Sequence, residues 1–144
     1  MLKSIDLFSG IGGLTLALHD VATPILYCDN AYNSQAVLMN LMHHNRLPKA
    51  PICPNVKDVT KGWVKKHCNE TKADLVVAGF PCTSISKMGL QQGFRELDKS
   101  GLFYEVLRIA DEMKIPMIFL ENVMNILKLE MNTVVKELAE KRGY

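Results

Sequence analysis

The sequence predicts an α/β protein with a mostly parallel sheet flanked by helices. Four short apolar segments, which end at Phe8, Cys28, Ala78 and Leu120, have the length and composition of buried strands. Amphipathic helical patterns separate these segments, and strands that alternate with helices form parallel sheets. A glycine-rich turn directly after the first segment also favours this fold, because such turns connect a strand to a helix in βαβ units.

The composition is that of a soluble globular chain. The 144 residues are 48% apolar and 22% charged, which suits one domain with a core of its own. The net charge of +2 is too small to indicate binding to nucleic acid or to a membrane surface by itself. The first residues do not have the pattern of a signal peptide, and none of the four cysteines has zinc-site spacing. Disulfides are the alternative, but we expect an intracellular protein, cytoplasmic in a bacterium or nuclear in a eukaryote, with free thiols and no metal.

The first expected strand, Ser4–Phe8, leads into the turn Ser9–Gly13 and then into a helix that begins near Leu14. This arrangement forms a cradle for a nucleotide-like ligand, because glycines let the ligand approach the backbone and the first helical N–H groups point at it. A full GxGxxG motif is absent, which weakens a dinucleotide interpretation. A tight βα turn without a ligand is the alternative.

Asp29 follows the second expected strand, Pro24–Cys28. An acidic residue at this strand end, about twenty residues beyond the glycine turn, is typical of sites that bind ribose hydroxyls. Alternatively, Asp29 or Asn30 caps the next helix, and the two roles are compatible. His43 and His44 near the end of that helix point in different directions, so we expect solvated side chains.

The next part of the chain is expected to be irregular. Leu47–Asn55 contains three prolines and is predicted to be a loop. Val56–Val59 is predicted to be a short strand end or a turn with Asp58 exposed. Lys61–Cys68 is predicted to be a short basic helix with Trp63 as its packing residue.

Cys82 lies in the segment Gly79–Ser86, directly after the expected strand Asp74–Ala78. A cysteine that a proline holds just past a strand end occupies the usual place of a nucleophile in an open α/β sheet. A small buried cysteine in a turn is the alternative, and an isolated Pro-Cys pair favours it. Lys87–Arg95 is either a mobile loop over a substrate pocket or a long connection.

The last third of the chain predicts two helices and a strand. Gly101–Ala110 has an apolar helical face, Met117–Leu120 is a buried strand, and Asn125–Arg142 is an amphipathic helix. Glu121 stands at the strand end. Since an α/β domain normally returns to its sheet after such a helix, we expect a piece of a longer protein.

Parallel strands place their carboxyl ends at one edge of the sheet. The glycine turn, Asp29, Asp58, Cys82 and Glu121 should therefore share one cleft. A nucleotide cradle, a thiol and a carboxylate together indicate an enzyme site.

The segments Asp6–Leu14, Gly79–Cys82 and Glu121–Val123, in this order, resemble the motifs of the cytosine-5 DNA methyltransferases. The resemblance covers essentially the whole chain. It implies a Rossmann-like S-adenosylmethionine-dependent methyltransferase fold, with S-adenosyl-L-homocysteine as a product. It also implies duplex DNA as the substrate and allows a second chain with the target-recognition region.

The resemblance also implies roles for individual residues. Cys82 would be the nucleophile that attacks carbon 6 of a flipped cytosine, and Glu121 would contact ring nitrogen 3. The cofactor residues would be Phe8, Gly10, Ile11, Gly12, Gly13, Leu14, Asp29, Asn30, Asp58, Val59, Pro81 and Leu102. Among these, Phe8 and Asp58 would contact the adenine and Asp29 the ribose. The substrate residues would be Phe80, Pro81, Ser86, Asn122 and Val123.

The chain also departs from the family pattern. Thr83 follows Cys82 where the family commonly has glutamine, and the arginine-bearing motif, the target-recognition region and the closing segment are missing. We therefore expect residues 1–144 to form one cofactor-binding catalytic subdomain with weak or no turnover of its own. Alternatives are methylation of cytosine in transfer RNA by the same chemistry, or a non-catalytic module that binds S-adenosylmethionine or a partner chain.

Overall fold

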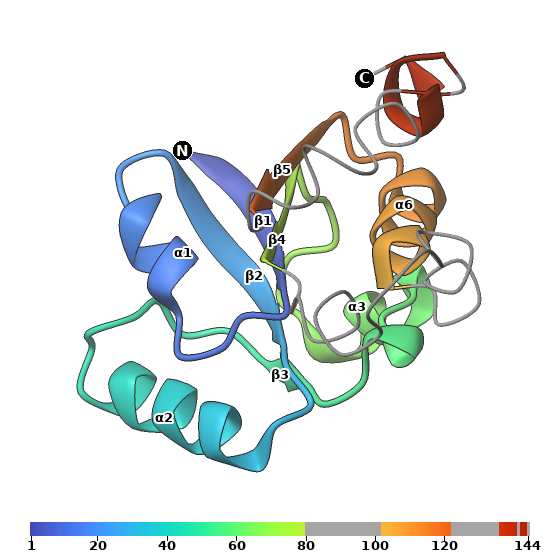
Figure 1. Cartoon of the computed structure of the whole chain (residues 1–144). Coiled ribbons are helices and arrows are strands. Elements are labelled where there is room, and N and C mark those ends of the chain that lie inside the picture. The colour runs from blue at the N-terminus through green and yellow to red at the C-terminus, as the bar shows by residue number, and fades with distance from the viewer. Residues whose placement is uncertain (80–101, 122–135, 141, 144) are drawn as a thin grey trace, which may run out of the picture.

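A parallel sheet of five strands forms the central layer of the computed structural model, which describes residues 1–79, 102–121, 136–140 and 142–143. The strand order is β3-β2-β1-β4-β5, and every neighbouring pair is parallel (Figure 1). The bounds of the strands are β1 Leu2–Leu7, β2 Ala22–Cys28, β3 Ile52–Cys53, β4 Leu75–Gly79 and β5 Met117–Glu121. This sheet confirms the predicted fold class.

Helices lie on both faces of the sheet. On one side are α1 (Gly13–Ala17) and α2 (Tyr32–His43), and on the other are α3 (Lys61–His67) and α6 (Leu102–Met113) (Figure 1). A short 3-10 turn, η1 (Val56–Asp58), precedes α3, and a π-helical turn, η2 (Lys136–Glu140), lies near the end of the chain. None of the helices in the described ranges is long and apolar enough to cross a membrane.

The core consists of apolar side chains that alternate between the two faces of the strands. Leu26 of β2 packs on the α3 and α6 side, whereas its neighbour Tyr27 packs against Leu38 of α2 on the other side. Leu26 and Tyr27 are both fully buried although they face opposite sides of the sheet, which explains why an internal parallel strand is a continuous apolar run. The described cysteines Cys28, Cys53 and Cys68 are buried free thiols, as expected.

Two expectations about the strands are wrong. The proline-rich segment Leu47–Asn55 is not only a loop, because Ile52 and Cys53 pair with Tyr27 and Cys28 of β2. Pro51 fits beside this strand because it needs only to accept a hydrogen bond, which Tyr27 N donates to its carbonyl oxygen at 2.9 Å.

The second error concerns β5, which is not buried on both faces. Its residues alternate in exposure: Ile118 and Leu120 pack against the core, whereas Met117 and Phe119 are 39% and 41% exposed. No helix in the described part of the chain covers the face that carries Met117 and Phe119. The expected helix Asn125–Arg142 falls mostly outside the described residues.

Candidate functional site

The carboxyl ends of the five described strands lie at one edge of the sheet, as parallel pairing requires. From β1 the chain extends through β2 to β3 on one side, and β4 and β5 lie on the other side. The strand order thus reverses between β1 and β4. Open α/β sheets bind ligands outside the carboxyl ends at such a reversal.

The turn after β1 is held in an unusual backbone conformation. Phe8, Gly10 and Gly12 have φ values of 55°, 54° and 88°, in the left-handed region. Ser9 attaches this turn to the end of β2: its backbone N–H donates to the Cys28 carbonyl at 3.0 Å, and its Oγ accepts from Cys28 N at 3.1 Å. The turn is therefore a fixed part of the sheet edge.

The glycines of this turn differ in their surroundings. A Cβ at Gly12 would lie 2.6 Å from Cδ1 of Leu47, so that side chain would have to shift, and the φ of 88° favours glycine. A Cβ at Gly10 or at Gly13 would meet no atom within 4 Å. The turn is therefore packed from below at Gly12 and open at Gly10 and Gly13, which suits a ligand that approaches the backbone. Ile11, between them, is 60% exposed.

Asp29 connects the end of β2 to the glycine turn. Its Oδ2 accepts from Gly10 N at 2.8 Å and its Oδ1 accepts from Ala31 N at 2.9 Å. The N-cap of α2 is Ala31, so neither Asp29 nor Asn30 is the N-cap residue, and that alternative is wrong as stated. Each carboxylate oxygen of Asp29 has a further lone pair for a hydroxyl donor.

Asp58 lies exposed at the end of η1. Asn55 Oδ1 accepts from Lys57 N at 3.0 Å and caps this turn. The charges of Asp29 and Asp58 both contribute to the raised pKa of the Cys28 thiol, whose main cause is burial, followed by the effect of Cys53. Both carboxylates therefore lie near the carboxyl end of β2.

Glu121 pairs with Gly79 where β4 and β5 end. A Cβ built on Gly79 would lie 3.1 Å from Glu121 Oε2 and 3.1 Å from Leu14 Cδ1. The absence of a side chain at Gly79 therefore leaves room for the Glu121 carboxylate beside the helix that follows the glycine turn. Glu121 is exposed.

The predicted site residues fall into three groups. The turn residues, together with Asp29, Asn30, Asp58 and Glu121, are at the carboxyl edge, and Asn30 is exposed. Leu102 begins α6 and packs partly buried against the main core, while Val59 is fully buried, with its N–H and carbonyl both hydrogen-bonded within the protein. The predictions that lie outside the described residues are Phe80, Pro81, Cys82, Ser86, Asn122 and Val123.

Asp6 is a supporting residue that the sequence reasoning missed. It is 3% exposed, and its two carboxylate oxygens accept from Ser4 Oγ at 2.7 Å and from Thr15 Oγ1 of α1 at 2.5 Å. Burial raises the pKa of Asp6, and the two hydroxyl hydrogen bonds oppose this rise. Asp6 thus joins α1 to β1 beneath the glycine turn. An acidic residue within an apolar strand was the available signal.

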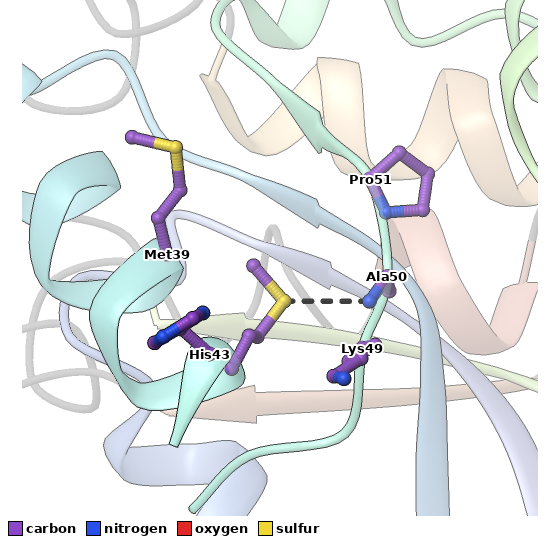
Figure 2. Close-up of a pocket in the computed structure, with 6 residues that line it drawn as sticks. Met39, His43, Lys49, Ala50 and Pro51 are labelled. Carbon is purple, nitrogen blue, oxygen red and sulfur yellow. Dashed lines mark hydrogen bonds between the residues drawn. The ribbon is translucent and has the colours of Figure 1, made fainter. Parts of the chain in front are cut away.

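A pocket of about 450 Å³ lies elsewhere, between the second half of α2 and the segment that leads into β3 (Figure 2). Ala50 N donates to Met42 Sδ at 3.4 Å across it. The pocket is lined by Met39, Met42, His43, Lys49, Ala50 and Pro51. It contains none of the predicted site residues.

A family model and the most similar curated proteins indicate the same protein family. The family model for C-5 cytosine-specific DNA methylase matches residues 2–144. Type II methyltransferase M.HhaI of Haemophilus parahaemolyticus is 32% identical over 124 residues, which are 86% of this chain and 34% of that protein. Type II methyltransferase M.Bsp6I of Bacillus sp. (strain RFL6) is 30% identical over an alignment of 147 positions, which covers 100% of this chain and 44% of that protein. The chain thus spans less than half the length of these relatives.

Solved structures support the same fold. A mutant of Spodoptera frugiperda DNMT2 superposes with a TM-score of 0.67 at 19% identity, over 98% of this chain and 41% of that one. The ribosomal protein L11 methylase of Lactobacillus delbrueckii subsp. bulgaricus gives a TM-score of 0.54 at 16% identity, over 96% and 59%. These similarities and the parallel sheet indicate a Rossmann-like methyltransferase fold. From the match over residues 2–144, the chain belongs to the C-5 cytosine-specific DNA methylase family.

Proposed function

We propose that this chain binds S-adenosylmethionine at its carboxyl edge and carries the catalytic groups of a DNA cytosine-5 methyltransferase. The observation that supports this most directly is the open glycine turn, hydrogen-bonded to Asp29 at 2.8 Å, at the same sheet edge as Glu121. Residues 1–144 would then be one cofactor-binding catalytic unit. The region that recognises the DNA target sequence would lie outside residues 1–144 or in a second chain.

The residues present fit the proposed cofactor. The open backbone at Gly10 and Gly13 leaves space for the methionine part, and the half-buried ring of Phe8 offers an apolar surface for the adenine. Asp29 would accept from the ribose hydroxyls, and Asp58 from the adenine amino group. When bound, the cofactor supplies an electrophilic methyl group on a sulfonium to carbon 5 of the cytosine.

The chain's own groups would activate the base. The Cys82 thiolate forms a bond to carbon 6 of a flipped cytosine, so that the ring electrons become available at carbon 5. The Glu121 carboxyl group hydrogen-bonds ring nitrogen 3 and stabilises the charge that develops there. After methylation, loss of the carbon 5 proton expels Cys82 and restores the aromatic ring.

The experiment that tests this function is covalent trapping with a duplex that contains 5-fluorocytosine, in the presence of S-adenosylmethionine. Fluorine at carbon 5 prevents proton loss, so the adduct with Cys82 should persist. The chain is tested both alone and linked to a polypeptide that supplies target recognition. Cys82→Ser should abolish the adduct, and Cys68→Ser serves as the control.

An adduct that survives Cys82→Ser would refute the assigned nucleophile. An adduct with a transfer RNA substrate but not with duplex DNA would support the alternative substrate. Absence of any adduct even in the linked protein would favour a non-catalytic module.

A further inference from the structure

Arg108 of α6 makes a set of contacts that the proposed chemistry does not use. Its Nη2 donates to two backbone carbonyls of the η1 region, Val56 O at 3.1 Å and Val59 O at 3.0 Å. These carbonyls flank Asp58, and the guanidinium is therefore attached to the chain on both sides of that residue. The contact joins residues 49 and 52 positions apart in the sequence.

The guanidinium is itself held by two carboxylates of the same helix. Its Nε donates to Glu105 Oε2 at 2.9 Å, and its Nη1 donates to Glu112 Oε2 at 3.0 Å. Glu105 and Arg108 are only 20% and 33% exposed, so their interaction is less screened than that of a surface pair. The planar fork of arginine satisfies the carboxylates and the carbonyls at once, which an ammonium cannot do.

Glu112 links Arg108 to a second helix, α3. Its second oxygen, Oε1, accepts from Lys61 N at 2.8 Å at the start of α3. Thus α6 holds the chain before and after Asp58, whose own side chain is exposed. The flanking valines are anchored in the core, with Val56 7% and Val59 0% exposed.

We propose that Arg108 is a positioning residue for the cofactor site: it fixes the Val56–Val59 turn so that Asp58 is presented to the adenine amino group. The inference rests on the proposed function, because it takes the adenine contact of Asp58 from it. Arg108 touches neither ligand nor reacting atoms in this scheme and acts only through Asp58. A purely structural ion pair is the competing interpretation, and the two differ in what Arg108 does to ligand selectivity.

The test uses Arg108→Met and Arg108→Lys, with Arg142→Met as the matched control. Arg142 also pairs with α6, through Asp111 at 2.8 Å, but it contacts Glu137 and not the η1 turn. The first measurement is hydrogen exchange at the amides of Asp58 and Val59, which bond within the turn to Asn55 O and Val56 O. Loss of the Arg108 contacts should accelerate this exchange about tenfold or more, whereas Arg142→Met should leave it unchanged.

The second measurement compares the Kd of S-adenosylhomocysteine with that of its analogue without the purine 6-amino group. The wild-type chain should prefer the amino compound about tenfold or more, since one hydrogen bond to a charged group provides at least this ratio. Arg108→Met should remove most of this preference, with Arg108→Lys in between. Arg142→Met should keep it even if its thermal stability falls.

The outcomes distinguish a failure of the positioning role from a failure of the proposed cofactor site. Unchanged exchange in both Arg108 variants would overturn the inference, and so would accelerated exchange with an intact preference for the amino compound. The wild-type chain could also show slow exchange at the Asp58 and Val59 amides and yet bind neither S-adenosylhomocysteine nor its analogue. That result would contradict the proposed cofactor site, and the positioning role with it.

Discussion

Asp29 is the residue on which the proposed cofactor site depends most. Its carboxylate accepts hydrogen bonds from Gly10 N and Ala31 N, and thus connects the glycine turn to the start of α2. We predict that Asp29→Ala weakens S-adenosylhomocysteine binding about tenfold or more, because a charged acceptor for the ribose is lost. Isothermal titration calorimetry measures this, with Asp20→Ala as the control, since the Asp20 side chain is 86% exposed. Equal affinity of the Asp29 variant and wild type would exclude a ribose contact.

Asp6 gives a pH-dependent prediction. Burial raises its pKa in the folded state above the ordinary value of 3.8. The folded state therefore binds this proton more tightly than the unfolded state, and the free energy of unfolding contributed by Asp6 falls as the pH rises from 3.8 through the folded-state pKa.

Asp6→Asn removes this titration while it keeps the size of the side chain. Urea unfolding between pH 4 and pH 7 should show that the variant gains stability relative to wild type as the pH rises. A difference between Asp6→Asn and wild type that does not change with pH would contradict the assigned role of burial.

At the scale of elements, the glycine turn between β1 and α1 combines a stability requirement with an open surface. Gly12→Ala should lower the free energy of unfolding by about 1–3 kcal/mol, because it places a Cβ against Leu47 in a left-handed backbone.

Gly13→Ala places a Cβ with no atom within 4 Å, so it should change the free energy of unfolding by no more than about 1 kcal/mol. It should nevertheless weaken cofactor binding. Gly62→Ala in α3 is the control, with ordinary contacts to Thr60. Chemical denaturation and calorimetry measure the two effects, and unaltered binding by Gly13→Ala would show that the ligand does not approach this backbone.

Much of this fold could be predicted because its signals are local. β1, β2, β4 and α6 follow from apolar runs and helical spacing, and the glycine turn follows from its composition. β3 could not be predicted, since its two residues become a strand only through pairing with Tyr27 and Cys28. The exposed face of β5 also depends on which other parts of the chain cover it.

The site shows the same division between local and non-local information. Parallel topology was enough to place Asp29, Asp58 and Glu121 at one edge. The hydrogen bonds of Asp6 to Thr15, and of Arg108 to Val56, join residues from separate elements. No sequence spacing encodes such contacts, so they required the structure.

For the whole molecule, the net charge of +2 and the length relative to the relatives bear on activity. Binding to duplex DNA depends largely on cationic contacts with phosphates. In this chain 15 Asp and Glu residues nearly balance 17 Lys and Arg residues, so the net attraction to DNA is small. We predict weak or no methyl transfer by residues 1–144 alone, measured with duplex DNA and radiolabelled S-adenosylmethionine. Robust incorporation into cytosine would contradict this prediction.

The central claim is that the carboxyl edge of the sheet, rather than the pocket beside α2, binds S-adenosylmethionine. Hydrogen exchange of the chain with and without saturating S-adenosylhomocysteine tests it most directly. The expected result is slower exchange at the amides of residues 9–14 and 29–31 and around Asp58, with no change at Met42, His43 or Ala50. Protection confined to the α2 pocket, or no protection anywhere, would contradict the claim.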